Sequence, residues 1–189
     1  HNFMFTEGFM IKNADKIEAL YNKYNVKLNL SGHMHIQHIE DRGVAEVVTS
    51  SLAVAPNHFA NIRYDKKSFR YWTESLEVYK VECFEKISRH EFDGVGQRQL
   101  VRLFKTNSFE DINESDIDKM GKTFVKMNEK YFAGEVFDTA GFEEGMKLWE
   151  EQPESFTSLY IRSILDSVYK DQNTFEVNLR KGKNGEIFR

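Results

Sequence analysis

Hydrophobic and polar residues alternate with two different periods in the first part of the chain. Residues 14–24 carry apolar side chains at helical spacing, which predicts a helix capped by Asn13 and closed by Asn25. Residues 26–30 alternate strictly, as in a strand. Further strands are expected over 45–49, 61–64, 68–72 and 78–81. A helix that feeds a strand, followed by short strands, predicts a mixed sheet in an α/β domain.

The pattern becomes helical after about residue 83, so we divide the chain into domains 1–82 and 83–189. The strongest helix is capped by Asn113 or Ser115 and ends at Gly134. Its apolar face consists of Ile117, Met120, Phe124, Met127 and Tyr131, and helical spacing favours a core over a partner-binding stripe. Other helices are expected over 84–106, 140–152 and 153–168, and the tail from residue 174 is ambiguous, with one strand as an option.

Composition excludes several classes of protein. The 189 residues are 40% hydrophobic and 30% charged with a net charge of −4, which is a globular composition and lacks the basic surface that nucleic-acid duplexes require. No apolar run approaches the roughly 20 residues of a membrane-spanning helix. The single cysteine excludes an internal disulfide. The chain begins at His1 without a methionine, which we interpret as processing or as a fragment of a longer protein.

The candidate chemistry lies in the first domain, where five of the six histidines fall within 58 residues. A predicted strand ends at Ser31-Gly32, and His33 and His35 follow. Glycine permits a tight turn, and such a turn can direct two imidazoles at neighbouring metal ions. Imidazole nitrogen suits Zn, Mn, Fe or Ni. The competing interpretation is a pair of surface or hydrogen-bonded structural histidines.

The segment Ser31-Gly32-His33-Met34-His35 resembles the last signature of the calcineurin-like metallophosphoesterases, in which Gly-His-x-His follows a core strand. The resemblance extends to His1-Asn2, which is similar to the end of an upstream histidine motif, and to the Thr49-Ser50-Ser51-Leu52 stretch. It covers residues 1–82. It implies the C-terminal portion of a metallophosphoesterase β-sandwich with a flanking helix, followed by a mainly α-helical domain.

The resemblance also implies a function for the intact protein. Two divalent metal ions (Mn, Fe, Zn or Ni) would activate a hydroxide that hydrolyses a small phosphoester, either a phosphodiester or a nucleotide. His33 would bind one ion together with His1, and His35 would bind the other. His38 and His58 match no ligand position. They are expected as surface histidines, with loop or substrate-side positions as the alternative.

The sequence departs from the family pattern in one large respect. The upstream Asp-x-His, Gly-Asp and Gly-Asn-His-Asp/Glu motifs are absent, including the histidine that would protonate the leaving group. We therefore expect this chain alone to be inactive and to contain no catalytic residue. The alternative is a non-catalytic binding or structural module that retains part of the metal site. The helical domain would be either a cap beside the metal site or a protein-binding module, and contact between its helices and His33 would favour the cap.

Overall fold

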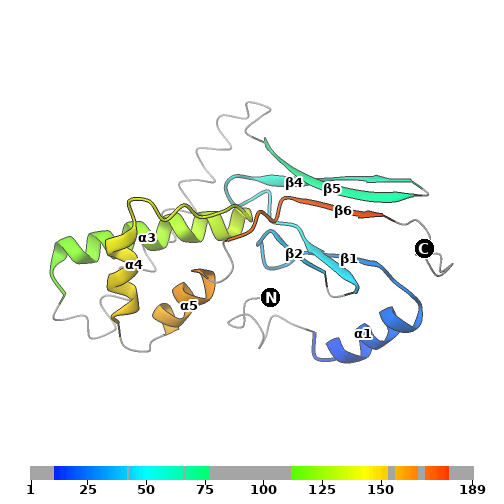
Figure 1. Ribbon diagram of the computed structural model, residues 1–189, viewed down its shortest axis with the longest axis horizontal. Helices are drawn as coiled ribbons and strands as arrows, with labels where there is room; N and C mark the ends of the chain where they lie inside the picture. The colour runs from blue at the N-terminus through cyan, green and yellow to red at the C-terminus, as the bar shows by residue number, and fades with distance from the viewer. Residues whose placement is uncertain are drawn as a thin grey trace.

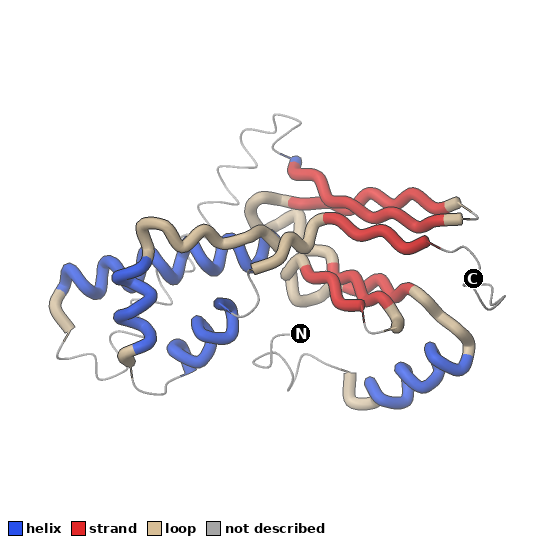
Figure 2. The backbone as a smooth tube through the Cα atoms, viewed as in Figure 1, coloured by secondary structure: helices blue, strands red, loops and turns tan. Residues whose placement is uncertain are grey.

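The computed structural model describes residues 11–41, 43–65, 67–76, 112–152, 156–165 and 169–178. It is a mixed α/β molecule with two small sheets and a group of helices beside them (Figure 1). The strands lie together at one end of the molecule and most helices at the other (Figure 2). The general prediction of an α/β region followed by helices is confirmed.

The first sheet has the strand order β1-β3-β2. Its strands are β1 (Leu28–Ser31), β2 (His38–Asp41) and β3 (Ala45–Val48). β3 pairs in parallel with β1, with Ser31 opposite Val48, and antiparallel with β2. The predicted first helix is α1 (Ala14–Lys23), which precedes β1 and buries no residue. β2 was not predicted.

The second sheet is antiparallel, with the order β4-β5-β6. β4 (His58–Tyr64) and β5 (Ser68–Ser75) form a hairpin whose turn is closed by Asp65. The Asp65 carboxylate accepts hydrogen bonds from the backbone N–H groups of Lys67 and Ser68, at 2.6 and 2.8 Å. β6 (Thr174–Asn178) comes from the far end of the chain and pairs with β5. The ambiguous tail therefore begins with a strand.

The described helices of the second half are α3 (Glu114–Ala133), α4 (Glu143–Glu150) and α5 (Phe156–Leu165). Of the two predicted caps of α3, the structure selects Asn113, whose side chain accepts a hydrogen bond from Asp116 N at 3.0 Å. Gly134 ends the helix at φ 65°, in the left-handed conformation that glycine adopts at low cost. Both ends of α3 agree with the prediction.

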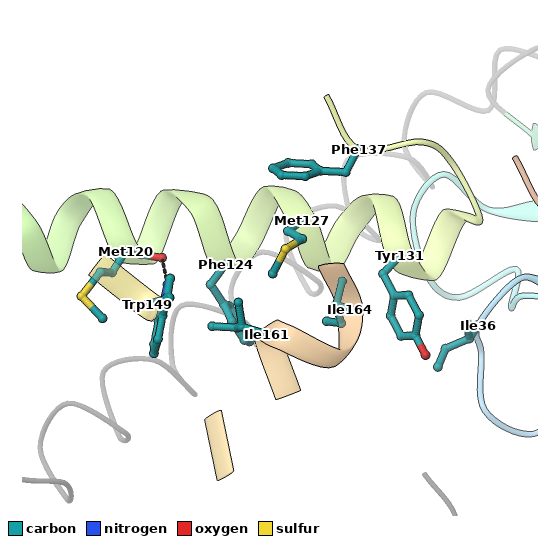
Figure 3. Close-up of a cluster of buried hydrophobic side chains, with 9 residues drawn as sticks. All are labelled: Ile36, Met120, Phe124, Met127, Tyr131, Phe137, Trp149, Ile161 and Ile164. Carbon is teal, nitrogen blue, oxygen red and sulfur yellow. Dashed lines mark hydrogen bonds between the residues drawn. The ribbon is translucent and has the colours of Figure 1, made fainter. Parts of the chain in front are cut away.

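Two separate hydrophobic cores result. The helical core consists of Ile36, Met120, Phe124, Met127, Tyr131, Phe137, Trp149, Ile161 and Ile164 (Figure 3). The sheet core consists of Ile39, Val47, Phe69 and Tyr71, and because these come from both sheets, the sheets pack face to face across it. The predicted apolar face of α3 is thus largely core, as expected.

Some predictions concern residues that the structure does not describe. Outside the described ranges lie the strand over 78–81, the helix over 84–106, the start of the last helix at Pro153 and the boundary between residues 82 and 83. Within those ranges, no helix has the length and apolar character needed to cross a membrane.

Candidate metal centre

The predicted histidine motif forms the connection between β1 and β2. The Ser31 hydroxyl, at the end of β1, donates a hydrogen bond to Glu46 Oε1 on β3 at 3.2 Å. The chain then leaves the sheet through Gly32, and both His33 and His35 are exposed to solvent. Two imidazoles of one short loop are therefore accessible from outside the protein.

The backbone of this loop differs from the expectation. The tight turn was assigned to Gly32, but the residues with positive φ are His33, at 80°, and His35, at 58°. A residue with a Cβ seldom adopts this left-handed conformation, because its Cβ approaches the following carbonyl oxygen. Left-handed non-glycine residues occur preferentially at functional sites, where the surrounding structure holds them in place.

The loop lies at an edge of the first sheet where two parallel strands end together. Thr49 N donates a hydrogen bond to Ser31 O at 3.1 Å, so the segment that follows β3 runs beside the start of the loop. Ligands of open α/β sheets bind outside the carboxyl ends of such strands. Ser50 lies in this segment, and its Oγ is buried without a hydrogen-bond partner among the described residues. This hydroxyl is a polar group that the histidine motif alone did not identify.

Side chains alternate between solvent and core along the loop. Met34, between the two histidines, packs against the helical core, and Ile36 is 5% exposed and belongs to that core. Figure 3 shows Ile36 beside Tyr131 at the C-terminal end of α3. The helical half therefore contacts the residues that alternate with His33 and His35 in the sequence. Its role as a cap or as a protein-binding module stays a prediction.

The other candidate histidines are placed differently. His38 begins β2, where its Nε2 lies 3.7 Å from Glu40 Oε2, and His58 begins β4 and is 8% exposed. The expectation of loop or surface positions is wrong for both. His38 lies in a strand with a side chain 19% exposed, and the hairpin β4–β5 carries His58 into the interior. His1 lies outside the described residues.

The two loop histidines alone do not complete a metal site. No group of three or more His, Cys, Asp or Glu side chains converges anywhere in the described ranges. His33 and His35 supply two imidazoles of the type that Zn²⁺ and related ions bind, and a complete tetrahedral or larger coordination shell needs further ligands. Assignment of His33, His35 and His1 as metal ligands stays a prediction.

Comparison with known protein families supplies independent information on the second half. Residues 79–173 match the model of a family described as the C-terminal domain of cyclic nucleotide phosphodiesterase. The match covers just over half of the chain and includes α3, α4 and α5, but it excludes the histidine loop and ends just before β6. No protein with curated annotation matches the chain.

Proposed function

The chain belongs to the family of the C-terminal domain of cyclic nucleotide phosphodiesterase, and from this premise we propose that it forms part of a metal-dependent phosphoesterase whose metal site includes His33 and His35. The family relation makes the chain phosphodiesterase-related and supports a hydrolase of phosphoester bonds. The metal site, the calcineurin-like β-sandwich and the two-ion mechanism are our proposal.

One observation carries the proposal. Two exposed imidazoles follow the end of a strand that pairs in parallel with its neighbour, and both histidines have left-handed backbone conformations. Such conformations cost free energy, and two surface histidines with no ligand would gain nothing that offsets this cost. In a ligand-binding loop they are useful, because the backbone conformation sets the direction of each side chain.

The proposal assigns each residue a separate role in metal or substrate binding. His33, together with His1, would hold one divalent ion, and His35 would hold the second. Two such ions supply Lewis acidity and a hydroxide nucleophile for phosphoester hydrolysis. The hydroxyl of Ser50, which is buried without a partner among the described residues, would donate a hydrogen bond to a bound oxyanion. The remaining ligands and the proton donor would come from the upstream motifs that the resemblance requires.

We propose a phosphodiester as the substrate class, with cyclic nucleotides as the first compounds to assay. This choice rests on the description of the family that matches residues 79–173. Nucleoside phosphates and phospholipid headgroups contain the same phosphoester chemistry and are the competing substrates in such an assay.

The decisive experiment is a titration of this chain with Zn²⁺ by isothermal calorimetry. We expect His33→Ala and His35→Ala each to weaken Zn²⁺ binding about 10-fold or more, since even partners outside the coordination shell contribute about 10–100-fold. His38→Gln removes a third imidazole from the same half of the chain and serves as the matched control, with an affinity equal to wild type.

Two results would contradict the proposal. Equal losses in His38→Gln and His33→Ala would mean that Zn²⁺ binds histidines without selection. Wild-type affinity in both loop variants would remove the metal site and would favour a non-catalytic module.

A further inference from the structure

Gln37, the second residue after His35, is a buried side chain with several hydrogen bonds. It is 1% exposed. Its Nε2 donates to Gln172 O at 2.8 Å, and its Oε1 accepts from Tyr71 OH at 3.1 Å and from Ser50 N at 3.3 Å. Its backbone N–H donates to Phe132 O at 3.0 Å. A buried amide with both ends engaged has a single orientation, so the backbone that follows His35 is fixed.

These partners come from four separate parts of the fold. Phe132 lies near the end of α3, Gln172 precedes β6, Ser50 follows β3 and Tyr71 lies in β5. Gln172 is itself buried, and its Oε1 accepts from Ile39 N in β2 at 2.8 Å. We call Gln37, Tyr71, Phe132, Gly134 and Gln172 the glutamine junction. It connects the helical half to Gln37, which follows the histidines, and to Ile39 in β2.

Gly134 allows the helical half to approach Gln37. A Cβ at this position would lie 2.6 Å from Gln37 Cγ and 2.8 Å from Gln37 Cβ, which is closer than real Cβ contacts. Gly134 O accepts hydrogen bonds from Gln172 N at 2.8 Å and from Asn173 Nδ2 at 3.0 Å. The end of α3 therefore lies in direct contact with Gln37, and any side chain at position 134 would overlap the glutamine.

We propose that Gln37 is a positioning residue through which the helical half fixes the directions of His33 and His35 for metal binding. The inference rests on the proposed function. The left-handed conformations at 33 and 35 are unfavourable by themselves, so neighbouring contacts must hold them. Met34 is held by the helical core, and Gln37 by the glutamine junction. Loss of the junction lets the loop relax, and His33 and His35 then no longer point toward their two neighbouring ions.

The test compares four variants of the full chain. Gln37→Ala removes the amide, and Gly134→Ala drives a methyl group into it from the helical side. Gly145→Ala is the control, because its Cβ would clash even more closely, at 2.0 Å from Thr123 Oγ1 and 2.7 Å from Lys119 O, but within the packing of α3 and α4. Tyr71→Phe removes one donor from Gln37 without opening space and gives a fourth, milder variant that keeps the fold.

Two measurements are made on each variant. Calorimetry gives the Zn²⁺ affinity, and long-range ¹H–¹⁵N spectra of the imidazoles show which histidine nitrogens bind Zn²⁺. We expect Gln37→Ala and Gly134→Ala to weaken Zn²⁺ binding about 10–100-fold, as for other residues that orient a metal ligand. At least one of His33 and His35 then loses its Zn²⁺-induced shift, Tyr71→Phe changes the affinity in the same direction, and Gly145→Ala keeps both shifts.

The outcomes separate this inference from the proposed function. Wild-type protein in which Zn²⁺ shifts neither His33 nor His35 overturns the metal site, and the positioning role with it. Wild-type protein that binds through both histidines, with Gln37→Ala unchanged, overturns the positioning role alone. The same holds if Gly145→Ala loses the imidazole shifts as fully as Gly134→Ala, because general destabilisation then explains both.

Discussion

The helical core and the region around the histidine loop are held together by different interactions. The helical core is formed by apolar side chains, of which Met120, Met127, Ile161 and Ile164 are completely buried, although its helices also bury the small hydroxyl residues Thr123, Ser158 and Ser163. The sheet core has only four buried members, and next to it lie the buried polar side chains of the glutamine junction. The first depends on the amount of apolar surface removed from water, and the second on the geometry of a few hydrogen bonds.

This difference indicates how the two regions share their tasks. Apolar packing tolerates changes of shape as long as volume is conserved, whereas a buried polar network fixes one arrangement. A region that directs two exposed imidazoles needs one arrangement. The packed helices form a stable unit, and the hydrogen bonds of the glutamine junction fix the loop relative to it.

The largest expected effect tests the apolar side of this comparison. Trp149 is 1% exposed, and its Nε1 donates to Met120 O at 2.9 Å, as Figure 3 shows. Trp149→Ala leaves a cavity and an acceptor without its donor, so we expect the free energy of unfolding to fall by about 3–5 kcal/mol in urea denaturation.

The matched control is Tyr169→Ala, at an aromatic residue that is 76% exposed, and there we expect a change within about 0.5 kcal/mol. A loss of less than about 1 kcal/mol in Trp149→Ala would mean that apolar burial does not dominate the helical region.

An intermediate effect tests the polar side. The Tyr71 hydroxyl donates to Gln37 Oε1 and lies 3.1 Å from Thr49 Oγ1, and burial raises the pKa of this phenol, so it stays protonated as a donor. Tyr71→Phe keeps the ring but removes one of the two hydrogen bonds to Gln37 Oε1 and the contact with Thr49 Oγ1. We expect the free energy of unfolding to fall by about 1–2 kcal/mol.

Tyr21→Phe is the same chemical change at a half-buried hydroxyl, which donates to Asn29 Oδ1 at 3.2 Å. There we expect a loss of about 0.5 kcal/mol or less, since water replaces the partner. If both variants lost the same free energy of unfolding, burial would add nothing to the strength of the Tyr71 hydrogen bond.

The smallest effect lies outside both cores, in the turn between β4 and β5. Backbone N–H groups of Lys67 and then of Ser68 hydrogen-bond the Asp65 carboxylate and hold its pKa below the ordinary value of 3.8. This contribution to stability is present above pH 3.8 and is lost as the pH falls through the lowered pKa. In Asp65→Asn, the free energy of unfolding should therefore decrease less than in wild type as the pH falls below 3.8.

Carboxyl ¹³C spectra across an acid titration measure the Asp65 pKa directly. A midpoint at or above 3.8 would contradict the turn geometry. An unchanged acid limb in Asp65→Asn would show that the turn is already frayed in the folded protein.

The sequence predicted elements wherever local signals agree. For α3, the cap Asn113, the spacing of Met120, Phe124 and Met127 and the final Gly134 all indicate the same helix, and the structure has it. β2 was missed because its four residues, His38–Asp41, show no strand pattern of their own. They are extended because β3 pairs with them and because Gln172 accepts the Ile39 N–H.

The candidate site divides in the same way. His33 and His35 stand out in the sequence because two imidazoles follow a strand and a glycine. Gln37 has no such signal, since a glutamine near a histidine motif is chemically ordinary. Its importance comes from Phe132 and Gln172, which are distant in the sequence and reach it only in the folded chain.

The sequence by itself determined most of the described helices and strands and singled out the histidines that we propose as metal ligands, because periodicity, caps and side-chain chemistry are local properties. Only the tertiary structure decided that β6 returns to β5, that His58 is buried and that the helical half holds the histidine loop through Gln37. These features depend on contacts between distant segments, whose free energy is set by packing and hydrogen bonding that no local pattern contains.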